Sequence, residues 1–141
     1  MDNKQIIEAF DRDNAPFYLV DHENGEFSLC LPLDFLTKEY ADFGQSAFNR
    51  YAEQIGDPIE ERGLYTHGCG YEWESVFKKA FESDASLSKI GFDCEAGGFF
   101  CYASDLSLLA EFGSRFRTMC MDEDSFGDLV CKALEEAAIR E

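Results

Sequence analysis

Apolar and polar residues alternate in two stretches of the chain, and a pair of turn-forming residues divides each stretch. The first stretch, "PFYLVDHENGEFSLCLP", begins at Pro16 and contains Asn24-Gly25, which is typical of a two-residue hairpin turn. Because successive side chains of a strand point to opposite faces, this turn predicts one apolar face. That face would pair Val20 with Leu29 and Tyr18 with Leu31.

The second stretch, "FDCEAGGFFCYAS", runs from Phe92 to Ser104 and predicts another hairpin. A turn at Gly97-Gly98 would place Cys94 opposite Cys101, whereas a turn at Ala96-Gly97 is also compatible and would break that pairing. In the first register, the period of two separates two faces. The apolar face would carry Ile90, Phe92, Cys94, Phe99, Cys101 and Ala103, and the other face Asp93, Glu95, Phe100 and Tyr102.

Most of the remaining chain has apolar residues every three or four positions, the period of an amphipathic helix. Residues 36–55 follow it as one helix or as two helices broken near Gly44, and "GDP" at 56–58 ends the pattern. The segment "YEWESVFKKAFES" predicts a helix with Trp73 on its buried stripe. Two more helices would follow, one capped by Ser104 and one capped by Asp122 or Asp124. Residues 1–14 are expected to form a short helix or to be partly ordered.

These elements predict an α+β fold. Two hairpins would form an antiparallel sheet, and three or four amphipathic helices would cover its apolar face, since two isolated hairpins are not stable in water. No strand–helix–strand alternation is present, so a parallel sheet is not expected. With 141 residues, the chain has the usual size of a single domain, and we expect residues 1–141 to form one.

Acidic residues dominate the charge of the chain. Its 29 acids and 12 bases give a net charge of −17, spread nearly evenly along the sequence. Such a surface repels nucleic acid and anionic membranes and speeds association with a basic partner, although it also serves solubility alone. No apolar run is long enough to span a membrane, and no signal peptide is evident at the N-terminus. We therefore expect a cytoplasmic protein.

The six cysteines do not form a metal-binding or disulfide pattern. No C-x-x-C pair occurs, and the chain is too large to need disulfides for its stability. We interpret the cysteines as reduced residues, most of them in the core. His67 and Cys69 in "HGC" offer two soft ligands, but structural zinc sites usually draw their ligands from close pairs. The sequence therefore predicts neither a metal ion nor a cofactor.

Acidic and aromatic residues near the second hairpin are the candidates for function. Asp93 and Glu95 lie roughly 7 Å apart at their Cα atoms if the strand is regular, a spacing compatible with acid–base catalysis. No third group that would orient a substrate is evident, and an exposed acidic pair beside aromatics is more typical of protein recognition. The acids of 122–124 favour a helix start and would add to an acidic patch. The predicted partner-binding residues are Asp93, Glu95, Phe100, Tyr102, Tyr71, Glu72, Glu74, Asp122, Glu123 and Asp124.

Three segments in the second half of the chain carry a family resemblance: "HGCGYEWESVFKKAF", "IGFDCEAGGFFCYAS" and "DLSLLAEF". Their order and spacing resemble those of the immunity protein 51 family, which is found beside bacterial polymorphic toxins. A proline is often found in that family where this chain has Cys94. The matching positions are Gly70, Trp73, Phe92, Asp93, Glu95, Ala96, Phe99, Tyr102 and Ser104.

This resemblance implies a cytoplasmic protein without enzymatic activity that binds a cognate toxin domain and blocks it. Two other hypotheses remain open. A nucleic-acid mimic that inhibits a nuclease or restriction enzyme would concentrate its acids in rows with phosphate-like spacing, and the even spread of acids here does not demand that. A small hydrolase using Asp93 and Glu95 would hold both acids in a concave pocket.

Overall fold

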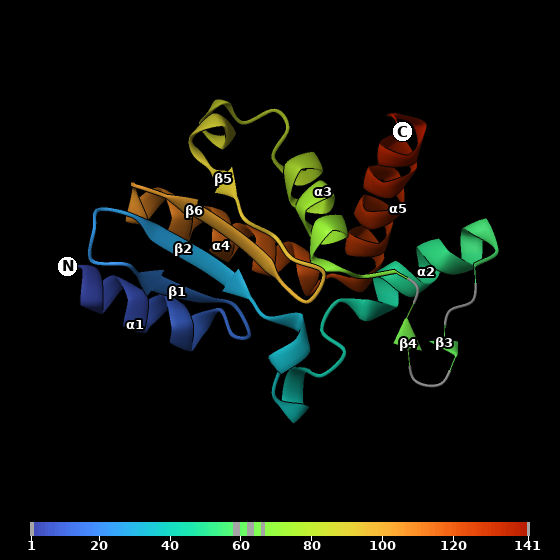
Figure 1. The fold of residues 1–141 in the computed structure, drawn as a ribbon, viewed down its shortest axis with the longest axis horizontal. Coiled ribbons are helices and arrows are strands. Elements are labelled where there is room, and N and C mark those ends of the chain that lie inside the picture. Colours follow the sequence, from blue (N-terminus) through green and yellow to red (C-terminus); the bar gives the residue numbers. More distant parts are fainter. Residues whose placement is uncertain (1, 58–59, 62–63, 66, 141) are drawn as a thin grey trace.

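The computed structural model describes the chain except for residues 1, 58–59, 62–63, 66 and 141. Within the described residues, five α-helices and two antiparallel sheets form (Figure 1). The helices are α1 (Asn3–Asp13), α2 (Gln45–Ile55), α3 (Gly70–Ala80), α4 (Leu106–Cys120) and α5 (Glu123–Arg140). Short 3₁₀ turns are η1 (Leu33–Phe35), η2 (Lys38–Tyr40) and η3 (Ala85–Lys89).

The larger sheet has four antiparallel strands in the order β1-β2-β6-β5. The two predicted hairpins therefore join through β2 and β6, and the predicted α+β class is confirmed. A separate two-stranded sheet pairs β3 (Glu60–Glu61) with β4 (Leu64–Tyr65). The strands of the larger sheet are β1 (Tyr18–Asp21), β2 (Phe27–Leu31), β5 (Gly91–Phe92) and β6 (Phe99–Ala103).

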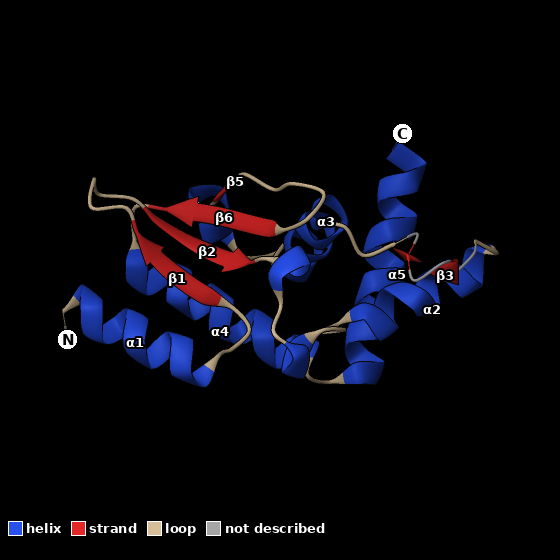
Figure 2. Ribbon diagram, turned by 60° about the horizontal axis from the view of Figure 1, so that its bottom comes forward, coloured by secondary structure: helices blue, strands red, loops and turns tan. Residues whose placement is uncertain are grey.

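Helices cover one face of the larger sheet. In Figure 1 the strands lie in front of α4, and no described helix lies in front of them. Helix α1 lies along β1 and contacts α4, and α2, α3 and α5 pack together beyond one end of the sheet (Figure 2).

The described helices exceed the expected three or four because the N-terminal segment forms a full helix. Its start is fixed by a reciprocal pair, in which the Asp2 carboxylate accepts from the Gln5 N–H at 2.8 Å and the Gln5 amide oxygen accepts from the Asp2 N–H at 3.0 Å.

The predicted register of the first hairpin is wrong by one residue. Leu19 lies opposite Leu29, whereas Val20 lies opposite Ser28. The loop has five residues rather than two, because the Asn24 side chain accepts from the Glu26 N–H at 3.0 Å and folds the loop locally. A slip of one residue exchanges the faces of a strand. Leu19 is consequently buried and Tyr18 exposed, the reverse of the expectation for β1.

The second hairpin adopts the alternative turn centred on Ala96-Gly97. Glu95 pairs with Gly98, and Phe92 pairs with Cys101. Cys94 and Cys101 are therefore not opposite each other. This register differs from the first expectation by two residues, which leaves every side chain on its expected face. Phe99, Cys101 and Ala103 are buried as predicted, and Tyr102 is exposed.

The helices begin and end largely where the sequence placed them. Helix α2 starts after Gly44, which confirms the break there, and it ends at Gly56. Helix α4 is capped by Asp105 instead of Ser104, because the Asp105 carboxylate accepts from the Leu108 N–H at 3.0 Å. At α5 the Asp122 carboxylate accepts from the Ser125 N–H at 3.2 Å. This confirms Asp122, one of the two residues predicted to cap this helix.

An aromatic cluster joins the sheet to the group of helices beyond its end. Phe116 of α4 lies at this junction, with its ring 6.1 Å from that of Phe99 on β6 and 6.0 Å from that of Trp73 on α3. Trp73 is buried, as its place on the apolar stripe predicted, and stacks on Phe43 with 6.2 Å between ring centroids. Other rings in contact with Phe116 are those of Phe17, Phe77, Phe81 and Phe126.

Two glycines in the left-handed region bracket α2 and offer a matched test of this packing. Gly44 has φ of 73° and Gly56 has φ of 78°, but a Cβ on Gly44 would lie 2.6 Å from the Trp73 ring, whereas one on Gly56 would meet nothing within 4 Å. We expect Gly56→Ala to cost about 1 kcal/mol of unfolding free energy from backbone strain alone. Gly44→Ala should cost about 2 kcal/mol more, because the indole has to shift within a packed core. Urea unfolding followed by circular dichroism measures both, and equal losses would contradict the proposed contact.

Candidate protein interaction surface

The face of the sheet opposite α4 carries exposed aromatic side chains. The pairing Tyr18–Cys30–Phe100 forms one row across β1, β2 and β6, and Cys30 is buried between its two aromatic neighbours. Tyr102 lies in the next row, beside Ser28, with its ring over the backbone of Gly91. The sheet therefore presents Tyr18, Phe100 and Tyr102 on a face that no described helix covers (Figure 2).

The hairpin that joins β5 and β6 carries the predicted acidic pair. Strand β5 ends at Phe92, but the Asp93 N–H still donates to the Phe100 carbonyl at 3.0 Å, and the two arms pair again at the isolated bridge between Glu95 and Gly98. Both carboxylates are exposed, and neither has a hydrogen-bond or ion-pair partner among the described residues. The structure thus brings Asp93 and Glu95 together with Phe100 and Tyr102, as the sequence predicted for these four residues.

The start of α3 touches the tip of this hairpin. The Gly70 N–H donates to the Ala96 carbonyl at 3.1 Å, and the following Tyr71 is 57% exposed. The two predicted acids of α3 are already engaged. Glu72 holds His67 and the Gly68 N–H, and the Glu74 carboxylate pairs with Lys78 at 2.7 Å. Of this group, only Tyr71 presents an unoccupied side chain beside the hairpin.

The third predicted group, Asp122 to Asp124, lies elsewhere. Asp122 precedes α5 and the other two acids lie in its first turn, where Glu123 lines a small hollow with Gly44 and Ser46 at the start of α2. Asp122 is occupied in capping α5. Among the described residues no hydrogen bond or ion pair joins these acids to the hairpin, and the role predicted for them remains an independent proposal.

Two residues beside the hairpin tip were missed by the sequence predictions. The Asp34 N–H of η1 donates to the Gly97 carbonyl at 3.1 Å, which places Phe35 next to the tip, and Phe35 is 83% exposed. Nothing local in "LPLDFL" distinguishes an exposed phenylalanine from a buried one, because the direction of the side chain depends on the turn. We call the group Asp34, Phe35, Tyr71, Asp93, Glu95, Phe100 and Tyr102 the hairpin surface.

The thiols are free, and four of the six are buried, in agreement with the predicted core role. Cys94 lies near the acidic pair but on the opposite face of the hairpin, and its Sγ donates to the Phe100 carbonyl at 3.3 Å. Burial raises the pKa of Cys94 to about 12, so this thiol stays protonated at neutral pH. Such a group is a poor nucleophile.

His67 bridges the carboxylate of Asp57, which follows α2, and that of Glu72 in the first turn of α3. Its Nδ1 lies 2.8 Å from Glu72 Oε2, and its Nε2 lies 2.8 Å from Asp57 Oδ2. The ring also packs edge-on against Tyr51, with 5.2 Å between ring centroids. Burial lowers the pKa of His67, but the hydrogen bonds to Asp57 and Glu72 more than offset this, so the pKa is raised. The arrangement favours an imidazolium that links Asp57 to Glu72 at the start of α3.

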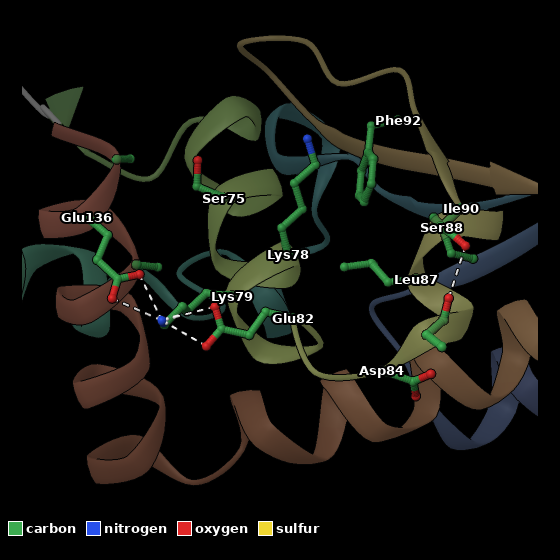
Figure 3. Close-up of a pocket in the computed structure, with 13 residues that line it drawn as sticks. Ser75, Lys78, Lys79, Glu82, Asp84, Leu87, Ser88, Ile90, Phe92 and Glu136 are labelled. Atoms are coloured by element: carbon green, nitrogen blue, oxygen red, sulfur yellow. Dashed lines mark hydrogen bonds and ion pairs between the residues drawn. The ribbon is translucent and has the colours of Figure 1, made fainter. Parts of the chain in front are cut away.

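A broad groove lies between α3, α5 and the η3–β5 segment (Figure 3). It encloses about 800 Å³, and Leu87, Ile90 and Phe92 form its apolar side. Its charges are largely paired with one another. Lys79 reaches Glu82 at 2.9 Å and Glu136 at 2.8 Å, linking α3 to α5. Asp93 and Glu95 do not line this groove, nor the hollow beside the α4–α5 turn.

The described residues contain no group of three or more His, Cys, Asp or Glu side chains arranged to hold a metal ion. None of the described helices is both long enough and apolar enough to cross a membrane. The structure is an α+β fold in which exposed aromatic side chains on an open sheet face lie beside an exposed acidic hairpin, a form suited to contact with another macromolecule.

Comparison with known protein families agrees with this class. The model of a family described as Immunity protein 51 matches residues 17–135, and the chain belongs to that family. The match extends the resemblance, which the sequence motifs carried only over the second half, to both hairpins and to α2. A family of immunity proteins implies a toxin as the partner. No curated protein and no solved structure matched the chain.

The His67 bridge predicts a definite dependence of stability on pH. Because the pKa of His67 is raised on folding, its contribution is fully present below the unfolded pKa of about 6.5 and is lost as pH rises through the folded pKa. Replacing His67 by Gln should therefore cost about 1 kcal/mol of unfolding free energy near pH 6 and less near pH 9. Urea unfolding of both proteins across this range measures the difference, and a pH-independent difference would show that the ring is uncharged.

Proposed function

We propose that this chain is an immunity protein that binds a cognate bacterial toxin domain and neutralises it by direct protein–protein contact. The membership of the family supports this proposal most directly. We further propose that the hairpin surface takes part in the contact, and that the protein acts in the cytoplasm of the producing cell. The single structural observation that carries the assignment of the surface is the exposed, unpaired acidic pair of Asp93 and Glu95 beside exposed aromatics.

Charge supports a basic partner. The chain has a net charge of −17. The carboxyl side chains of the hairpin surface, Asp34, Asp93 and Glu95, are all exposed. Lys78 on α3, whose ammonium lies 4.7 Å from the centroid of the Phe92 ring, is already paired with Glu74. Complementary charge steers a basic toxin such as a nuclease toward this side, with association rate constants above the ~10⁵–10⁶ M⁻¹s⁻¹ of neutral pairs.

The groove of Figure 3 is a weaker candidate for the same contact. Lys79 is paired with Glu82 and Glu136 inside the groove, and Lys78 and Asp84 are paired with residues outside it, so a partner would have to displace existing ion pairs. Asp93 and Glu95, in contrast, require no such displacement. The same exposed position disfavours the hydrolase hypothesis, since general acid–base catalysis needs a carboxyl group held in a shaped, partly dry pocket.

Reversing the charge of the hairpin tests this assignment. We expect Asp93→Lys combined with Glu95→Lys to fold normally, because both side chains are exposed, and to lower the association rate with the toxin domain about tenfold at ~50 mM salt. The deficit should shrink at ~500 mM salt because screening removes the repulsion. Circular dichroism checks the fold, and biolayer interferometry with the domain encoded by the adjacent reading frame measures the rates.

A matched variant separates a local effect from a change in total charge. Glu8 on α1 and Glu53 near the end of α2 are exposed and far from the hairpin in the sequence, and Glu8→Lys with Glu53→Lys changes the net charge equally. This control should bind within about threefold of the unmodified protein. Equal losses in both double variants would remove the hairpin from the interface.

A further inference from the structure

Phe35 is the one phenylalanine that the fold leaves in solvent. All 14 phenylalanines lie among the described residues, and 10 of them are buried. Phe43, Phe92 and Phe100 are partly buried, whereas Phe35 is 83% exposed. Burying a phenylalanine side chain typically stabilises by about 1.5–3 kcal/mol, and Phe35 contributes none of this to the folded chain.

The backbone holds Phe35 in a fixed position. Its N–H donates to the Pro32 carbonyl at 2.9 Å, and the Asp34 N–H donates to Gly97 at 3.1 Å. Leu33 and Leu36, on either side, pack against the core. The Asp34 carboxylate also lies so close to Gly97 that a Cβ there would come within 2.0 Å of it. Because η1 follows β2 directly and is tied to the hairpin tip, Phe35 is presented without a flexible linker.

The surroundings of Phe35 combine apolar and acidic groups. Tyr71 lies on the other side of the hairpin tip, since the neighbouring Gly70 bonds to Ala96. Asp34, Asp93 and Glu95 supply exposed carboxylates around this tip. A rigid aromatic side chain within a polar rim is the usual composition of an interaction hot spot.

Among the side chains whose exposure is described, one other apolar residue, Ile139, is exposed to a similar extent but differs in its position. Ile139 is 85% exposed but lies in the last turn of α5, at the end of the chain. Side chains at the end of a helix are often exposed to solvent because the last turn frays. The exposure of Ile139 therefore does not indicate a binding partner. Ile139 is therefore a suitable control for Phe35.

We propose that Phe35 anchors the contact with the toxin domain by entering an apolar pocket of the partner, whose rim carries lysine or arginine side chains facing Asp34, Asp93 and Glu95. This inference rests on the proposed function and names the partner chemistry of the same surface. The area around the anchor excludes water, so the loss on truncating Phe35 appears mainly as faster dissociation and depends little on salt.

The experiment compares Phe35→Ala, Phe35→Leu and Ile139→Ala with the unmodified protein, using the purified toxin domain encoded by the adjacent reading frame. We expect Phe35→Ala to raise the Kd at least about thirtyfold, at ~50 mM and at ~500 mM salt alike. Phe35→Leu should recover most of the affinity because it refills an apolar pocket, and Ile139→Ala should bind normally. Thermal unfolding of all variants should match that of the unmodified protein, since both side chains are exposed.

The possible failures are distinguishable. If the unmodified protein does not bind the toxin domain, the proposed function is overturned and this inference with it. If the unmodified protein binds and Phe35→Ala binds within about twofold of it, the anchor is overturned while the function stands. A loss for Phe35→Ala that disappears at high salt would also contradict an apolar pocket, since burial of an aromatic side chain is not screened.

Discussion

The packing of Phe116 against rings from both parts of the molecule is the interaction on which the rest of the structure depends. Its ring touches Phe99 of the sheet and Trp73 of the helices beyond the sheet, so one side chain of α4 spans the junction. The sheet has an apolar face that cannot remain in water, and α4 with its phenylalanines covers it. This junction also fixes the start of α3, and through the bond from Gly70 to Ala96 it fixes the hairpin tip. The packing of the core therefore holds the hairpin surface in position.

This arrangement explains how an acidic chain can offer a specific contact. The strong negative charge favours approach of a basic partner from many directions, but charge alone does not distinguish one basic protein from another. Fixed aromatic side chains supply the distinction, because they fit only a complementary surface. In this chain Phe35, Tyr71 and Tyr102 stand exposed at one end and one face of the sheet, next to carboxylates that no described residue pairs. Under the proposed function, long-range electrostatic attraction and short-range fit act at the same surface.

Sequence patterns predicted the class, the helices and most of the buried residues, but the strand registers depended on loop chemistry. A one-residue slip in the first hairpin reversed the expected faces of β1, because Asn24 folds a longer loop. A two-residue slip in the second hairpin changed the pairing of Cys94 and kept Phe100 and Tyr102 outside. Phe35 and the engagement of Glu72 with His67 were missed because both depend on contacts between distant segments. That residues 1–141 form one domain stays a prediction, which the continuous core supports.

The central claim is that this protein acts through the hairpin surface on a toxin domain. Hydrogen–deuterium exchange of the chain, alone and mixed with the proposed cognate toxin domain, tests this most directly because it needs no substitution. On complex formation we expect slower amide exchange in peptides covering residues 33–36 and 93–102. Peptides covering residues 75–90 and 133–137 should change little. Slower exchange confined to the latter peptides, which line the groove between α3 and α5, would contradict it.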